Sequence, residues 1–181
     1  MKKSLIQNQY KYFIYTLAGI ATVLFLILST KIRAAIIVTA FILINRLITT
    51  YKMFVRIPLE FEFLTLGIVL STLAFGIKAG IVIAIFGCIV SFIIGFEVSM
   101  FSLPMFLGYS SIAVTSFLLK GFDVILIGVI ATMINNIIVF LSYHFLFGYD
   151  IGKNLSFSIS NILFNLILFL NFASTLLKLI I

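Results

Sequence analysis

Charged residues are scarce in this chain of 181 residues: only 9% are charged, only five are acidic, and 64% are apolar. Soluble domains carry roughly a quarter charged residues, and a soluble chain of this size must still cover its core with polar groups. The composition therefore excludes a water-soluble globular domain. It predicts an all-α integral membrane protein that crosses the cell membrane several times.

Cysteine and histidine occur once each, and tryptophan does not occur. Cys88 lies inside an apolar run, which excludes an internal disulfide and is typical of a small buried residue. His144 has no histidine, cysteine or carboxylate at ligand spacing, so we expect no metal site. The twelve lysines and arginines stand singly between apolar runs. Without a basic stripe, the sequence predicts no nucleic-acid partner.

Motifs for catalysis or nucleotide binding are also missing. The chain contains no Gly-x-Ser-x-Gly, no His-Glu-x-x-His and no P-loop. We therefore expect no enzyme and no cofactor, and any use of ATP has to come from a partner protein.

Apolar runs long enough to cross a bilayer make up most of the chain. A hydrocarbon core of about 30 Å needs roughly 20 helical residues, and lipid-exposed backbone has to satisfy its own hydrogen bonds. The first run is too long for the apolar part of a signal peptide, so we interpret it as an uncleaved span. We expect a segment with one extra transmembrane helix over 1–30 and a six-helix membrane domain over 31–181. The seven predicted spans are 12–30, 34–51, 61–77, 79–95, 101–119, 122–147 and 155–181.

Charged residues and glycines predict the turns between spans. The chain has to turn near residues 29–33, because one helix through the first two spans would be about 64 Å long. The stretch Phe75-Gly-Ile-Lys-Ala-Gly80 is interpreted as a turn that brings Lys78 to the surface. A lysine at the bilayer centre would cost about 2.5–3.5 kcal/mol. Basic residues are shared almost evenly between the two sides, so the positive-inside rule leaves the orientation open.

Two of the acidic residues, Glu60 and Glu62, stand together in Arg56-Ile-Pro-Leu-Glu-Phe-Glu-Phe63. The proline predicts a helix start, with Glu60 near the N-cap and Glu62 in the first turn, where acids suit the positive end of the helix dipole. Residues two apart lie about 200° apart on a helix, so we expect at most one of them to face the bundle. Arg46, inside the second span, is interpreted either as a snorkelling anchor or as a partner of one carboxylate.

Polar residues of the last two spans recur at helical spacing, as Thr132, Asn136 and Tyr143 and as Ser158, Asn161 and Asn165. Such stripes are expected to turn away from lipid. Two interpretations stand: a polar cavity that binds a ligand, or interhelical hydrogen bonds of about 0.6–2 kcal/mol each. The small residues Gly76, Gly80 and Ala84 likewise indicate either close packing within the chain or docking of a partner helix.

Three features follow one another along the chain. A basic, alanine-containing helix begins Lys31-Ile-Arg-Ala-Ala-Ile-Ile-Val-Thr-Ala40, a loop ends Ile57-Pro-Leu-Glu-Phe61, and a short helix closes with Phe75-Gly-Ile-Lys-Ala-Gly80 before a glycine-rich helix. This order resembles the substrate-binding S components of energy-coupling-factor vitamin transporters, over residues 31–181 as six helices. The extra helix over 12–30 departs from that pattern.

The resemblance implies a membrane-embedded subunit that binds a vitamin-like micronutrient for uptake. Its implied partners are the small-molecule substrate, membrane lipid, a membrane coupling subunit and ATPases supplied by other chains. Its candidate substrate-binding residues are Arg56, Glu60, Glu62, Glu97, Asn136, Tyr143, Asn161 and Asn165. Its candidate partner-docking residues are Ala35, Thr39, Gly76, Gly80 and Ala84. Rod-shape-determining membrane proteins of the MreD type look like a related architecture, so a non-transporting scaffold subunit of a larger assembly is the alternative.

Overall fold

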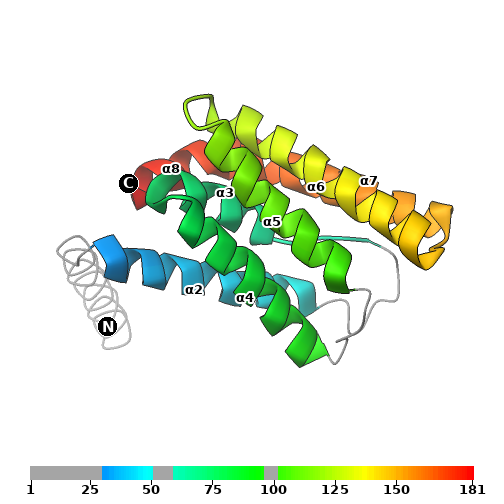
Figure 1. Cartoon of the computed structure of the whole chain (residues 1–181). Helices are drawn as coiled ribbons and strands as arrows, with labels where there is room; N and C mark the ends of the chain where they lie inside the picture. Colours follow the sequence, from blue (N-terminus) through cyan, green and yellow to red (C-terminus); the bar gives the residue numbers. More distant parts are fainter. Residues whose placement is uncertain (1–29, 51–58, 96–101) are drawn as a thin grey trace, which may run out of the picture. The chain divides into compact units, whose positions relative to one another are not determined.

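The computed structural model describes residues 30–50, 59–95 and 102–181. Of these residues 89% are helical and none lies in a strand, which confirms the predicted all-helical fold. Of the predicted span 12–30, only residue 30 belongs to the described residues. The helices are α2 (Thr30–Thr49), α3 (Leu64–Phe75), α4 (Ile77–Gly95), α5 (Ser102–Leu118), α6 (Val124–Phe147), α7 (Ile151–Leu168), the π-helical segment η2 (Phe169–Ala173) and α8 (Ser174–Ile180) (Figure 1).

The chain divides into two compact units, Met1–Ile36 and Ile37–Ile181. All the packing discussed below lies within the second unit. There α7, η2 and α8 follow one another without a break as a single helical run, Ile151–Ile180.

Within the described residues, three helical segments are long and apolar enough to cross a membrane: Thr30–Thr49, Val124–Phe147 and Ile151–Ile180. This fits a membrane protein, while the predicted count of seven spans stays a prediction. α3 has 12 residues and is about 18 Å long at 1.5 Å per residue, well short of a hydrocarbon core of about 30 Å. The predicted third span, 61–77, is therefore a half-length helix.

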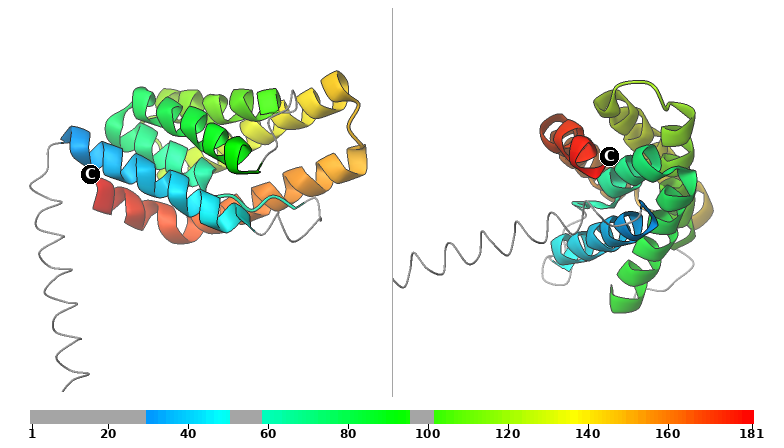
Figure 2. Two further views of the ribbon diagram at one scale, coloured as in Figure 1. Left: turned by 90° about the horizontal axis from the view of Figure 1, so that it is seen from below. Right: turned by 90° about the vertical axis from the view of Figure 1, so that its left-hand side faces the viewer.

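Helix α3 forms the centre of the second unit. Every residue from Leu64 to Thr72 is buried, and the helix packs against α4, α5, α6, α7 and α8 (Figure 2). Phe41 of α2 fits against α3 at Gly67, where an added Cβ would lie only 2.7 Å from the phenylalanine ring. A helix that is apolar all round belongs in a core, and α3 occupies such a position.

The turn between α3 and α4 lies at Gly76, as predicted. Gly76 has φ +90°, a conformation that suits glycine, and its N–H donates to the carbonyl of Thr72 over 2.9 Å. Lys78 is exposed at the start of α4. Gly80 is not part of the turn, because it lies inside α4. An added Cβ there would come within 3.1 Å of Ala113 near the end of α5.

Aspartates mark the starts of α6 and α7. The side chain of Asp123 accepts hydrogen bonds from two backbone N–H groups in the first turn of α6, and Asp150 accepts one, over 2.9 Å, from Lys153 of α7. α6 ends at Phe147 and is followed by Gly148, which has the left-handed φ of +63°. These caps pair N–H groups that a helix start leaves without partners, so they fix where the two long helices begin.

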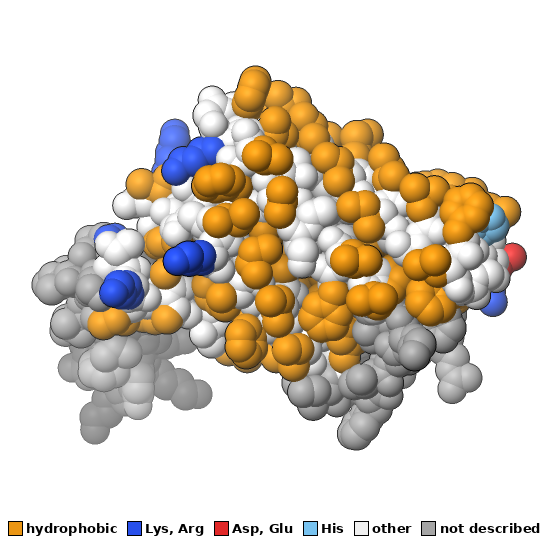
Figure 3. Space-filling view, in the orientation of Figure 1, with side chains coloured by type: hydrophobic (Ala, Val, Ile, Leu, Met, Phe, Trp, Pro, Cys, Tyr) orange, Lys and Arg blue, Asp and Glu red, His pale blue; other side chains and the backbone are white. Residues whose placement is uncertain are grey.

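The surface of the second unit is largely apolar between helix ends. Figure 3 shows hydrophobic side chains over most of the face formed by α4, α5 and α6. Exposed charges lie at or near helix termini, as at Lys78, Lys120 and Lys153. Because Gly80 lies beside Ala113, the start of α4 and the end of α5 share one side. α6 then carries the chain about 36 Å from the Lys120 side to the Lys153 side.

Candidate functional site

The carboxylate of Glu62 is completely buried just before α3, with 0% of the residue exposed. Its Oε2 accepts a hydrogen bond from the backbone N–H of Thr65 over 2.9 Å, and its Oε1 accepts one from the Thr65 hydroxyl. Oε1 also accepts from the side-chain amides of Asn161, at 3.4 Å, and Asn165, at 3.2 Å. The acid therefore caps the positive end of α3 and ties it to α7.

The network extends from α7 to α6 through side-chain amides. Asn136 donates to the side-chain oxygen of Asn161 and to the carbonyl of Thr132, each over 2.8 Å. Asn165 also donates to the Asn161 carbonyl over 3.1 Å. All four residues are buried, which confirms the predicted inward orientation for them, whereas Tyr143 of the same stripe is half-buried. The polar centre of the bundle thus joins three helices, α3, α6 and α7.

The segment before α3 is held by side chains from two other helices. The N–H of Glu60 donates to Ser160 Oγ of α7 over 2.8 Å, and the N–H of Phe63 donates to Asn45 Oδ1 of α2 over 2.7 Å. Both Glu60 and Glu62 are buried. The predictions that only one faces the bundle, and that Glu62 lies in the first turn, are therefore wrong. α3 begins at Leu64, so both acids precede it and the helical angle does not apply.

Several buried polar atoms of α6 and α7 have no hydrogen-bond partner among the described residues. They are the side-chain oxygens of Asn135, Asn136, Asn154, Ser158 and Asn165. In Asn136 and Asn165 the amide nitrogen already donates two hydrogen bonds to oxygen atoms. If the amide were flipped, its oxygen would face those two oxygens and neither hydrogen bond could form. The network therefore fixes these two amide oxygens as unpaired acceptors.

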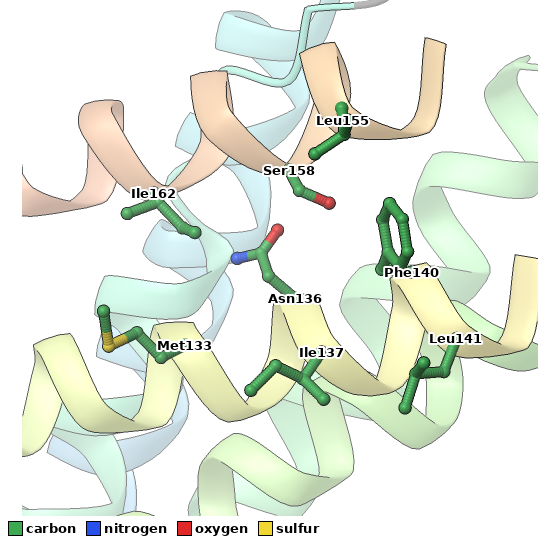
Figure 4. Close-up of a pocket in the computed structure, with 8 residues that line it drawn as sticks. All are labelled: Met133, Asn136, Ile137, Phe140, Leu141, Leu155, Ser158 and Ile162. Atoms are coloured by element: carbon green, nitrogen blue, oxygen red, sulfur yellow. The ribbon is translucent and has the colours of Figure 1, made fainter. Parts of the chain in front are cut away.

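A groove of about 360 Å³ lies between α6 and α7, and Asn136 and Ser158 extend toward it from opposite helices (Figure 4). Asn136 is 3% exposed and Ser158 7%, so both side chains are buried between the two helices. The other lining side chains are apolar: Met133, Ile137, Phe140, Leu141, Leu155 and Ile162. Asn136 thus has its amide nitrogen in the buried network and its oxygen unpaired beside the groove.

The structure brings together some of the predicted substrate-binding residues. Glu62, Asn136, Asn161 and Asn165 form one connected network, and Glu60 adjoins it through the backbone. Tyr143 lies two turns farther along α6, where its ring is 5.7 Å from that of Tyr149. The predicted residues Arg56 and Glu97 lie outside the described residues.

The predicted partner-docking residues divide by exposure. Ala35 and Thr39 of α2 are exposed, whereas Gly80 and Ala84 of α4 are buried within the unit. Gly76 forms the turn described above. The small residues of α4 thus serve close packing within the chain, and docking stays a prediction for the exposed face of α2.

Sequence reasoning missed three residues that build the site. Thr65 stands three residues after Glu62, a spacing typical of a local cap, and this signal could have been read. Asn45 and Ser160 contribute through contacts across 18 and 100 residues of sequence. Contacts of that separation leave no periodic signal in a single sequence.

Comparison of the chain with known protein families, with characterised proteins and with solved structures yields no match. Function has to be inferred from the geometry of this site.

Proposed function

We propose that this protein is a membrane-embedded substrate-binding subunit that takes up a micronutrient-sized molecule and is energised by separate partner proteins. The observation that carries the proposal is a groove of about 360 Å³ between α6 and α7, whose lining includes the buried polar residues Asn136 and Ser158. Binding pockets for small ligands have volumes of about 300–1,000 Å³ and are mostly apolar with a few convergent polar groups. The groove fits this description.

Unpaired acceptors favour binding over the alternative of a scaffold. Polar residues that only hold helices together are expected to pair with one another, because a buried polar atom without a partner costs about 1–3 kcal/mol. Asn136 and Asn165 each keep one oxygen unpaired although their nitrogens are fully used.

Energy for uptake would come from other chains, since the sequence has no nucleotide-binding motif. The face of α2 that carries Thr39 also exposes Leu43 and Leu47. In the proposed function this apolar face is where a membrane coupling subunit docks, with ATPases bound in turn to that subunit.

Purification of the full chain in mild detergent, followed by mass spectrometry of the small molecules released on denaturation, tests the proposal. We expect one small molecule in stoichiometric amount. Asn136→Leu should reduce its amount, because the substitution removes one of the acceptors. Asn171→Leu is the matched control: Asn171 is exposed and bonds only a carbonyl of its own helical run, at Ile167. Absence of any retained molecule, together with stably co-purifying membrane proteins, would favour the scaffold.

A further inference from the structure

Three exposed lysines lie at one end of the second unit. Lys78 at the start of α4 and Lys120 after α5 share this side. The helical run Ile151–Ile180 starts at the opposite side and places Lys178 about 38 Å beyond Lys153, at 1.5 Å per residue. α8, which carries Lys178, also packs against α3, and Figure 1 shows it at the same end as the turn between α5 and α6. Lys78, Lys120 and Lys178 are therefore called the lysine end.

The lysine end carries an excess of positive charge. Among the described residues of the unit, the acid on this side is Asp123, whose carboxylate already bonds two N–H groups of α6. The other end lies where α2 ends beside the segment before α3. Its charged residues are Arg46, Lys153, Asp150 and, deeper in the bundle, Glu60 and Glu62. Acids thus outnumber bases there, and the lysine end is the one that attracts anions.

Strongly exposed apolar side chains adjoin two of these lysines. Lys120 lies between Leu118, which is 73% exposed, and Phe122, which is 63% exposed, and Lys178 is followed by the equally exposed Leu179. Lysine stems lie along apolar surface while the ammonium group reaches the interface. The matching partner therefore combines a negative charge with an apolar chain. A hydrophilic acidic protein would match the lysines and leave the apolar side chains exposed to water.

The lysine end also lies at the depth of lipid headgroups. α6 extends over about 36 Å, and a bilayer with its headgroups is about 40–45 Å thick, so the residues just beyond the helix lie among the headgroups. Basic side chains at this depth attract anionic lipids, and the attraction falls off within a Debye length.

We infer that the lysine end binds the headgroups of anionic phospholipids, whose acyl chains lie along the apolar side chains next to Lys120 and Lys178. This interaction surface lies apart from the groove between α6 and α7, and it does not depend on which molecule the groove binds. It makes anionic lipid a partner that one end of the protein holds selectively.

Native mass spectrometry of retained lipid tests the inference. The full chain is placed in nanodiscs that contain equal amounts of phosphatidylglycerol and phosphatidylcholine with identical acyl chains, and is then extracted in mild detergent. Because the two lipids differ only in the headgroup, a preference reports on charge. We expect phosphatidylglycerol to be retained about fivefold or more over phosphatidylcholine, the preference that one lysine near an anionic surface provides.

Replacing the three lysines provides the second readout. The triple variant Lys78→Gln, Lys120→Gln and Lys178→Gln should lose most of the preference, whereas Lys153→Gln, at the other end beside Asp150, should keep it. The changed side chains are exposed, so folding should be retained. For the unaltered protein, extraction at about 1 M instead of about 0.1 M salt should weaken the preference, because the screening length falls from about 10 Å to about 3 Å.

Equal retention of the two lipids by the unaltered protein would overturn the inference. A preference that survives in the triple variant, or that Lys153→Gln reduces as strongly, would also overturn it. If the unaltered protein shows no lipid preference but co-purifies with a protein that the triple variant loses, the lysine end is a docking surface for an acidic protein and the inference is wrong.

Discussion

Replacing Asn161 by leucine should loosen the polar centre of the bundle. The side-chain amide of Asn161 makes two interhelical hydrogen bonds, accepting from Asn136 over 2.8 Å and donating to Glu62 over 3.4 Å. Leucine fills a similar volume but makes neither bond. At about 0.6–2 kcal/mol for each interhelical hydrogen bond in a membrane, Asn161→Leu should lower the free energy of unfolding by about 1–4 kcal/mol. Asn136 would keep its bond to the carbonyl of Thr132.

Unfolding in mixed micelles of a mild detergent and dodecyl sulfate, followed by circular dichroism, measures this difference. Asn171→Leu makes the same chemical change at an exposed position of the same helical run and should alter stability by less than about 0.5 kcal/mol. A double-mutant cycle between Asn136→Leu and Asn161→Leu should show a coupling of about 0.6–2 kcal/mol. If Asn161→Leu costs no more than Asn171→Leu, the network does not stabilise the fold and our reasoning about it fails.

Three further predictions concern other parts of the fold. Gly128→Ala should destabilise the protein by about 1–3 kcal/mol, because the new Cβ would lie 2.2 Å from the buried ring of Phe169; thermal unfolding in detergent measures it. Cysteines introduced at Lys78 and Lys153 should react with a membrane-impermeant maleimide from opposite sides of the membrane, since α6 separates their two sides by about 36 Å. Asn45→Leu should cost about 1–3 kcal/mol, because it leaves the N–H of Phe63 unpaired; the same unfolding assay applies.

Each of these has an internal control. Gly152→Ala, at an exposed position of α7, should leave stability unchanged or raise it slightly through helix propensity. If Gly128→Ala changes stability no more than Gly152→Ala does, Gly128 is not closely packed against Phe169. The native Cys88 is 1% exposed and should stay unlabelled in the folded protein, so reaction reports only on introduced cysteines. If the cysteines introduced at Lys78 and Lys153 were both labelled from the same side of the membrane, this arrangement of the helices would be refuted. For Asn45 the reference is again Asn171→Leu, and equal stability of the two variants would show that the Asn45 contact is dispensable.

Helix positions followed well from the sequence. The predicted spans 101–119 and 122–147 correspond to α5 and α6 within two residues at each end, because charged residues and glycines between them have no other place in a bilayer. Gly76 was predicted as a turn for the same reason. The inward orientation of Asn136 and Asn161 followed from helical periodicity and the cost of polar groups in lipid.

The central position of α3 could not be predicted. Its side chains are as apolar as those that face lipid, and composition does not distinguish an apolar residue buried in protein from one buried in a membrane. The predicted span 61–77 was too long at both ends for this reason. The partners of Glu62 were equally hidden, since Asn161 and Asn165 lie 99 and 103 residues away along the chain. Which amide oxygens stay unpaired depends on side-chain geometry that no single sequence contains.

The order in which the chain is synthesised leaves Glu62 without its α7 partners for a long time. Of the side chains that bond this carboxylate in the folded protein, only Thr65 is present until α7 emerges, because both asparagine partners come about 100 residues later. At about 5–20 residues per second, this interval lasts roughly 5–20 s. α3 is also too short to span a bilayer by itself, so it has to enter the membrane as one arm of a hairpin with α4. The nascent protein thus carries an incompletely bonded acid through most of its synthesis, and the fold can close around α3 only when its last helix arrives.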